Sequence, residues 1–307
     1  MRYHVVATIA AILLAAVQTC AHATPLSYNY LFFDIPGTDD NRAQGINSAG
    51  QVTGYARTSS GYESFIRNAD GTLTTFSVPG FGSTLAQGIN DAGQVAGSAG
   101  LPIQQGFVRN SDGSVTTFSV PGASSTSAWG INDAGQVVGF VRIGSGEQGF
   151  VRSGGGSVTT FSVPGSPFTV ATAINNIGQT AGFASNATST VGFVRNSDGS
   201  LTTFSVLSAP QITGINDLGQ IVGWDANTEE SFVREPDGVV NFLTVPAGDD
   251  LLAFGINDQG VITGYGFTPS GREMFIATPN VVPAPSSLTL FATALVGLLV
   301  LVRQKVI

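Results

Sequence analysis

Seven carboxylates lie in segments where an otherwise repetitive sequence varies. Oxygen-rich clusters of this kind can bind Ca²⁺, and two acids that flank a glycosidic bond can hydrolyse it. No pair stands out by its spacing, however, and charge that keeps loops soluble accounts for the same residues. We therefore predict only candidate binding residues, with no catalytic residue and no metal ligand: Asp39, Asp40, Asp225, Glu229, Glu230, Asp249 and Asp250.

The reactive residue types are confined to the ends of the chain. The only cysteine is Cys20, the two histidines are His4 and His22, and the single lysine is Lys305. The body between them lacks thiol, imidazole and amine side chains. This excludes Cys–His and Ser–His–Asp catalysis, histidine-ligated metals and Schiff bases there. We predict a non-enzymatic protein that needs no cofactor.

Acidic residues dominate the charge of the body. Between Thr24 and Val282, nine arginines stand against twenty aspartates and glutamates, which gives a net charge of −11. Such a surface repels nucleic acids and anionic membranes. We expect no nucleic-acid partner.

The first 23 residues have the features of a secretory signal peptide. Arg2 precedes an apolar run from Val5 to Val17, and Ala21-His22-Ala23 fits a cleavage site. The mature chain is then expected to begin at Thr24, after export through the inner membrane. Two alternatives remain open: a retained membrane helix, and a lipoprotein anchored at Cys20.

Residues 280–307 have three parts: a proline-containing motif, an apolar run expected to be a membrane helix over about 287–302, and a basic end. This tail resembles the PEP-CTERM sorting signal of Gram-negative bacteria, although Ala284 stands where that signal usually has Glu. The resemblance implies transient membrane anchoring, recognition by an exosortase peptidase, and then a cell-surface or extracellular location. An ordinary C-terminal anchor helix is the alternative. The residues that match the signal are Val282, Pro283, Pro285, Arg303 and Lys305.

One phrase, read best at Gly130–Gly139 as GINDAGQVVG, recurs six times with steps of 41 to 43 residues. Asn, Asp and Gly in its middle predict a tight turn between two short strands. A second phrase, F-V-R-x-x-D-G-x-x-T-x-F, predicts another hairpin with Asp-Gly at its turn. The third repeat is thus expected to hold four strands, over Ala128–Ile131, Gln136–Val141, Gln148–Arg152 and Ser157–Val163.

Four short antiparallel strands in about 42 residues are typical of a β-propeller blade. The segment Tyr30–Ile35 is a fourth strand without the preceding three, and the sixth repeat lacks its fourth strand. We therefore predict an all-β, six-bladed propeller over residues 24–279, closed by the N-terminal strand. An open β-solenoid is the alternative.

The two phrases together resemble those of the bacterial extracellular HAF-repeat family. The resemblance covers most of Leu31–Ile276, and Ala173 and Val261 are its two departures. It implies a repeat architecture and no particular activity.

The turns within the two phrases repeat almost unchanged, whereas the intervening loops differ in every repeat. Alternating strand direction places the repeated turns on one face of the disc and the varied loops on the other, so we expect binding on the varied face. Aromatic residues near the second strand suit either a sugar platform or packing between blades: Tyr55, Phe140, Phe183, Trp224 and Tyr265. A polysaccharide or another surface protein is the expected partner, and a carbohydrate-active enzyme is the alternative function.

Overall fold

The computed structural model describes residues 27–243, 250–269 and 271–280. The expected signal peptide, the sorting motif from Val282 to Lys305, and Asp249 lie outside the described residues. Within those residues, no helix is long and apolar enough to cross a membrane.

The described chain consists of strands joined by turns and loops. The N-terminal strand is β1 (Tyr28–Phe33). The first repeat holds β2 (Asp39–Ile46), β3 (Val52–Thr58), β4 (Gly61–Arg67) and β5 (Leu73–Phe76). The second holds β6 (Thr84–Ile89), β7 (Val95–Ala99), β8 (Gln105–Arg109) and β9 (Val115–Phe118). The third holds β10 (Ser125–Ile131), β11 (Val137–Ile143), β12 (Gly146–Arg152) and β13 (Val158–Phe161).

The remaining repeats follow the same order. The fourth holds β14 (Phe168–Ile174), β15 (Thr180–Ser185), β16 (Thr190–Arg195) and β17 (Leu201–Phe204). The fifth holds β18 (Pro210–Ile215), β19 (Ile221–Asp225), β20 (Ser231–Arg234) and β21 (Val240–Phe242). The sixth holds β22 (Asp250–Ile256), β23 (Ile262–Thr268) and β24 (Gly271–Pro279).

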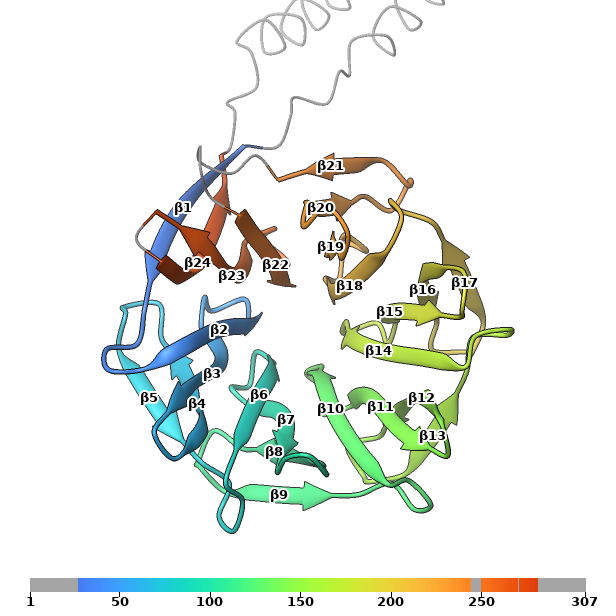
Figure 1. Ribbon diagram of the computed structural model, residues 1–307, viewed down its shortest axis with the longest axis horizontal. Coiled ribbons are helices and arrows are strands. Elements are labelled where there is room, and N and C mark those ends of the chain that lie inside the picture. Colours follow the sequence, from blue (N-terminus) through green and yellow to red (C-terminus); the bar gives the residue numbers. More distant parts are fainter. Residues whose placement is uncertain (1–26, 244–249, 270, 281–307) are drawn as a thin grey trace, which may run out of the picture.

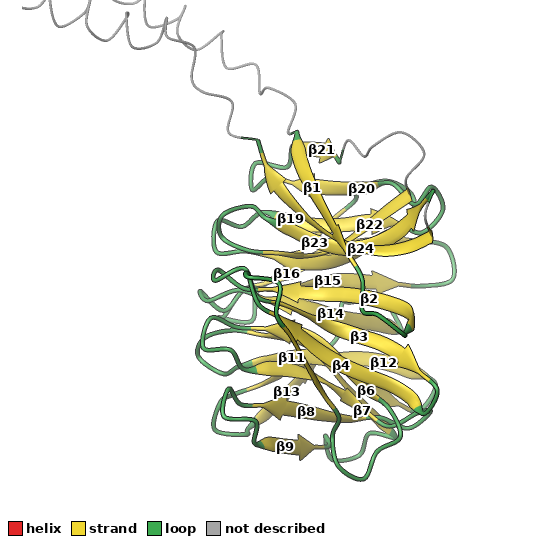
Figure 2. Ribbon diagram, turned by 90° about the vertical axis from the view of Figure 1, so that its left-hand side faces the viewer, coloured by secondary structure: helices red, strands yellow, loops and turns green. Residues whose placement is uncertain are grey.

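These strands form a propeller-like ring of four-stranded blades around a central channel (Figure 1). The first strand of each repeat lies innermost. Seen from the side, turns and loops lie along the two faces of the disc (Figure 2). The all-β propeller prediction is confirmed at this level.

The prediction of six separate blades needs a correction. Four blades stand alone as four-stranded sheets, whereas the strands of the third and fourth repeats form one eight-stranded sheet. The join is a single parallel pair, Glu147 with Phe168. In this pair the Glu147 N–H donates to the Pro167 carbonyl at 3.0 Å. β12 begins at Gly146, before the predicted Gln148.

The N-terminal strand completes the sheet of the sixth repeat. β1 pairs antiparallel with β24 over six residues, from Tyr28 opposite Pro279 to Phe33 opposite Met274. The Asn280 N–H also donates to the Ser27 carbonyl at 2.8 Å, so the two ends of the ring leave it side by side. The pairing covers the edge of β24, which would otherwise present unpaired backbone groups.

Packing within a blade depends on a glycine and a phenylalanine from the two phrases. The Phe107 ring is fully buried and lies against Gly97, where an added Cβ would come within 2.8 Å of it. Packing between blades depends on an arginine. The Arg109 guanidinium stacks 4.9 Å from the ring centre of Phe76, in the outer strand of the preceding blade. Its Nη1 also donates to the Asn110 carbonyl at 3.2 Å.

Candidate functional site

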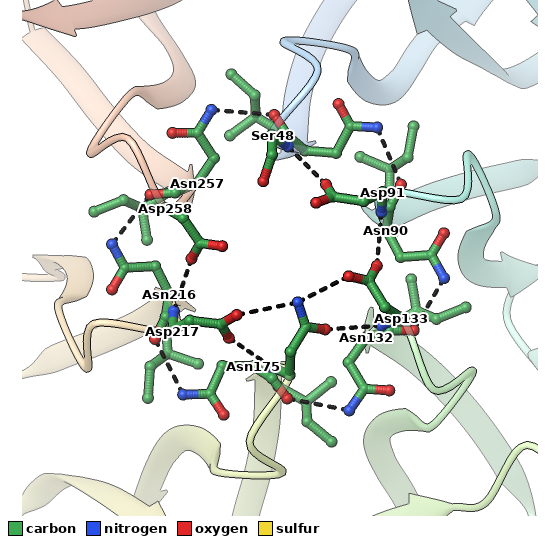
Figure 3. A pocket seen from close by; sticks show the side chains of 18 residues that line it. Ser48, Asn90, Asp91, Asn132, Asp133, Asn175, Asn216, Asp217, Asn257 and Asp258 are labelled. Atoms are coloured by element: carbon green, nitrogen blue, oxygen red, sulfur yellow. Dashed lines mark hydrogen bonds between the residues drawn. The ribbon is translucent and has the colours of Figure 1, made fainter.

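The repeated turns surround one mouth of the channel with polar side chains from all six repeats (Figure 3). Each turn is closed by a backbone hydrogen bond, such as Gly135 N–H to the Asn132 carbonyl at 3.0 Å. Gly135 adopts a φ of 69°, a left-handed value that favours glycine. The turn thus holds its Asn and Asp side chains at the channel.

The asparagine of each turn ties its blade to the next. Asn132 Nδ2 donates to its own Gln136 at 2.9 Å and to the Asn175 carbonyl of the next blade at 3.1 Å. Its Oδ1 accepts the Gln136 N–H at 3.0 Å. Because Asn132 is only 2% exposed, these bonds satisfy an amide that water hardly reaches. The same link recurs at all six junctions, through Asn47, Asn90, Asn132, Asn175, Asn216 and Asn257.

A second ring lies at the rim of this mouth. The Asp91 N–H donates to Asp133 Oδ1 at 2.8 Å, and the Asp217 N–H donates to Asp258 Oδ1 at 2.8 Å. Asn176 Nδ2 donates to both Asp133 and Asp217 and so bridges them. Burial is the main cause that raises the pKa of Asp258, and repulsion from the three other carboxylates adds to it, whereas the Asp217 N–H acts in the opposite direction.

Six isoleucines separate this mouth from the interior of the channel. They border both the polar mouth and the next cavity along the axis. Each is 6% or 7% exposed, so together they form a narrow apolar collar: Ile46, Ile89, Ile131, Ile174, Ile215 and Ile256. Beyond the collar the lining changes from repeat to repeat. It is made by Gln44, Gln87, Trp129, Thr172, Thr213 and Phe254.

The predicted loop carboxylates do not form one site. Asp225 is fully buried at the end of β19. Its Oδ2 accepts the N–H groups of Ser208 at 2.9 Å and Ala209 at 2.7 Å, and its Oδ1 accepts that of Asn227 at 2.8 Å. Burial pushes the pKa of Asp225 upward, but these N–H groups and that of Thr228 outweigh it and hold the pKa below its ordinary value. This carboxylate fastens two loops together.

Three other predicted carboxylates border a pocket beside β21. Glu229, Glu230 and Asp250 are exposed there, next to the buried Leu251. Asp39 is exposed at the start of β2, opposite Arg57 of β3. No group of three or more His, Cys, Asp or Glu side chains suited to a metal ion occurs among residues 27–243, 250–269 and 271–280.

Asp40 instead belongs to an arginine–tyrosine cluster, formed by Asp40, Arg42, Tyr55, Tyr62, Tyr265 and Arg272 at the junction of the first and sixth repeats. Asp40 binds Arg42 through Nε at 3.0 Å and Nη2 at 3.2 Å, and it also pairs with Arg272. The Tyr62 hydroxyl donates to Asp40 Oδ2 at 2.9 Å. Asp40 has a φ of 48°, a value uncommon outside glycine.

Aromatic rings surround the two guanidinium groups. Arg42 lies 5.8 Å from the ring centre of Tyr55 and 5.3 Å from that of Tyr265. Arg272 lies 5.5 Å from Tyr265 and 4.8 Å from the exposed ring of Phe267. Burial raises the pKa of Tyr55 to about 12, so its hydroxyl stays protonated at neutral pH. One carboxylate between two arginines leaves the cluster with a net positive charge in an acidic protein.

The comparisons with known proteins support the fold alone. No protein-family model matches the chain, and no curated protein matches it in sequence. A catalytically inactive histidine-to-alanine variant of virginiamycin B lyase from Staphylococcus aureus, bound to quinupristin, is 12% identical with a TM-score of 0.53. That match covers 84% of this chain and 90% of the lyase.

Other solved propellers are similar to the same extent. TolB from Acinetobacter baumannii is 14% identical, with a TM-score of 0.53, and the match covers 80% of this chain and 65% of TolB. A gluconolactonase from Xanthomonas campestris is 8% identical, with a TM-score of 0.54, over 84% of this chain and 96% of that enzyme. Because enzymes and TolB share the scaffold, the likeness assigns no activity.

Sequence reasoning missed both the channel ring and the partners of Asp40. The ring aspartates repeat with the turn phrase, so turn formation alone accounted for them. Arg42 and Arg272 lie in different repeats, and ring closure brings them together. One signal was available. Four of the nine body arginines lie outside the repeated phrase, and two of them, Arg42 and Arg272, have no arginine at the matching position of any other repeat.

Proposed function

We propose that this chain is an exported, non-enzymatic propeller of the bacterial cell surface or extracellular matrix, with its six repeats acting as six blades. It binds an extracellular polymer through the varied face, and an acidic polysaccharide is the partner with matching chemistry. One observation carries the proposal: the arginine–tyrosine cluster joins cationic and aromatic groups on strands β2, β3, β4, β23 and β24, near the loops that do not repeat.

The position of the chain ends supports this use of the varied face. Pro279 is the last residue of β24 and lies on the side of the repeated turns, where Tyr28 pairs with it. A C-terminal anchor and its exosortase would therefore act from the repeated-turn side. The varied loops would face away from the membrane, toward a partner outside the cell.

The enzymatic alternative lacks a matching set of side chains in the propeller. The chain has no histidine beyond His22 and no lysine before Lys305. A carboxylate pair would have to carry the chemistry, yet Asp225 and Asp40 are both engaged in several hydrogen bonds or ion pairs. We therefore favour binding without turnover.

Binding of uronate-rich and neutral polysaccharides to the purified chain tests the proposal. Tyr62→Ala combined with Arg272→Ala should weaken binding of the acidic polymer about tenfold. Phe168→Ala, which removes an exposed ring elsewhere on the varied face, should leave it unchanged. Product formation that a single Asp or Glu substitution abolishes would instead establish an enzyme.

Cell fractionation tests the export part separately. The chain should appear at the cell surface or in the medium, with mass analysis placing its new N-terminus at Thr24. After deletion of 303–307, the chain should appear in a different cell fraction from the full-length chain. A mature chain that keeps both the first 23 residues and Lys305 would overturn the processing proposal.

A further inference from the structure

A pocket of about 440 Å³ lies between the second and third repeats, on the side of the repeated turns. Its polar lining includes Gln94, Asn110 and Thr116 from the second repeat, and Arg152 from the third. The strands that contribute to the pocket, β8, β9 and β12, lie across the ring from β1 and β24 (Figure 1). The pocket is lined by repeated turns, whereas Tyr62 and Arg272 of the arginine–tyrosine cluster lie at the start of their strands, next to the varied loops. It is therefore a different site from the one on which the proposed function rests.

A break in the repeat coincides with this pocket. The turn after Arg152 reads Ser153-Gly154-Gly155-Gly156, whereas the turn after Arg109 reads Asn110-Ser111-Asp112-Gly113. Gly154 lines the pocket and has no side chain to fill it. Other repeats place a side chain at this position: Ala69, Ser111, Ser197 and Pro236.

The Gly-rich turn of the third repeat also lacks the aspartate that accompanies the equivalent arginine in the second repeat. In the second repeat, hydrogen bonds from Ser114 lower the pKa of Asp112, and attraction to Arg109 contributes in the same direction. Gly155 replaces that aspartate in the third repeat. Arg152 is therefore the repeated arginine whose turn offers no carboxylate.

The Arg152 guanidinium packs against an aromatic ring, and one of its nitrogens makes a long hydrogen bond to a backbone carbonyl. It stacks 4.7 Å from the ring centre of Phe118, like its counterparts in other blades. Its Nη1 donates to the Ser153 carbonyl at 3.5 Å, the long end of the 3.2–3.5 Å range over which the repeated arginines make this bond. A fixed guanidinium with donors to spare is suited to bidentate binding of a carboxylate.

The neighbouring amides can serve a ligand that carries hydroxyl groups. Gln94 Nε2 donates one hydrogen to Asn110 Oδ1 at 2.8 Å, and Asn110 Nδ2 donates one to Ser114 at 3.0 Å. Each amide nitrogen has a second hydrogen. The exposed Thr116 hydroxyl adds a donor and acceptor.

We infer that this pocket binds a uronate, the carboxylate-bearing sugar unit of an acidic polysaccharide. Arg152 pairs with the carboxylate, and Gln94, Asn110 and Thr116 bind ring hydroxyls. A single guanidinium matches a monoanion. A phosphate dianion is disfavoured because Asp133 also borders the pocket and the protein carries a net negative charge.

An NMR titration of the full chain with glucuronate tests this inference, with methyl glucoside and inorganic phosphate as comparison probes. Glucuronate should bind saturably, and both other probes at least tenfold more weakly. Arg152→Gln should weaken glucuronate binding at least tenfold. The matched control Arg109→Gln removes an equivalent stack on Phe76 and should leave binding unchanged.

Gly155→Asp provides a second variant that keeps Arg152. Its Cβ would meet nothing closer than Ser153 Oγ at 3.8 Å, so the fold should tolerate it. The new carboxylate should compete with the ligand and also weaken binding about tenfold. Absence of glucuronate binding to the wild type, equal binding of methyl glucoside or phosphate, unchanged binding by Gly155→Asp, or an equal loss in Arg109→Gln would each overturn the inference.

Discussion

Asn257 donates a hydrogen bond from its side-chain amide to the backbone carbonyl of Asn47, 3.1 Å away, across the junction where the last repeat meets the first. The bond equals the one that Asn132 makes to Asn175 inside the array, also at 3.1 Å. In this bond the closing junction matches an internal one. Strand β1 and the pairing of Asp40 with Arg272 add contacts to the closing junction.

Asn257→Ala should lower the free energy of unfolding by about 2 kcal/mol, because it leaves a buried carbonyl and two N–H groups without their partner. Asn132→Ala removes the equivalent bond to the next blade, together with the two bonds that Asn132 makes to Gln136, and should cost about as much. Urea denaturation of both variants measures this. A harmless Asn257→Ala beside a damaging Asn132→Ala would show that the ring does not stay closed in solution.

Replacement of Asp225 by Asn should destabilise the fold by about 1–3 kcal/mol. Its amide NH₂ would face the N–H groups either of Ser208 and Ala209 or of Asn227 and Thr228. The lowered pKa of Asp225 adds a pH signature. The wild-type carboxylate stabilises the fold above its ordinary pKa, and that stability is lost as pH falls through the lower folded pKa. Asp225→Asn should lose this acid dependence.

Thermal unfolding between pH 2 and 7 measures the difference. Glu229→Gln, an exposed carboxylate in the same loop, serves as the control and should behave like the wild type. Equal effects of the two substitutions would mean that Asp225 acts only through its charge.

The repeat phrase predicted the strands closely because its turn residues and the alternation along its strands determine local structure. The predicted strand Gln136–Val141 is observed as Val137–Ile143, and tight turns such as Asn132–Gly135 form as expected. Ring closure by the N-terminal strand was equally predictable, since a spare strand and a missing strand complement one another.

Contacts between repeats could not be predicted in the same way. The parallel pair of Glu147 with Phe168 depends on how far one loop extends toward its neighbour, which no local pattern encodes. Asp225 was grouped with the other loop carboxylates because its sequence context does not reveal that Ser208 and Ala209 fold over it. The binding of Asp40 to Arg272 likewise appears only once the ring has closed.

Asp258→Asn should stabilise the fold at neutral pH by about 0.5 kcal/mol, a modest value because solvent screens the partly exposed carboxylate. The raised pKa means that the folded state holds a proton more tightly than the unfolded chain. Stability therefore falls as pH rises from the ordinary value of 3.8 through the folded pKa. Asn176 already fills the equivalent place in the ring and accepts the Asp133 N–H at 2.9 Å.

Melting temperatures of wild type and Asp258→Asn should differ at pH 7 and converge below about pH 3.8. Below that pH the Asp258 carboxyl is protonated in both the folded and the unfolded wild type. Asp39→Asn removes the same charge from an exposed strand end. An equal gain in that control would assign the effect to net charge rather than to the channel ring.

Gly88→Ala should destabilise the fold by about 1–3 kcal/mol, the usual effect of forcing an extra methyl into a packed site. A Cβ there would lie 2.6 Å from the Trp129 carbonyl oxygen and 3.2 Å from Gly130 Cα, both in the neighbouring innermost strand. Backbone atoms cannot swing aside as a side chain can, so the two blades would have to separate. Gly82→Ala is the matched control, because nothing lies within 4 Å of the added methyl. Ala173 occupies the equivalent position in the fourth repeat, so one junction accommodates the methyl, and this sets the lower end of the expected range. An unchanged free energy of unfolding in Gly88→Ala would mean that the other junctions can accommodate it equally well.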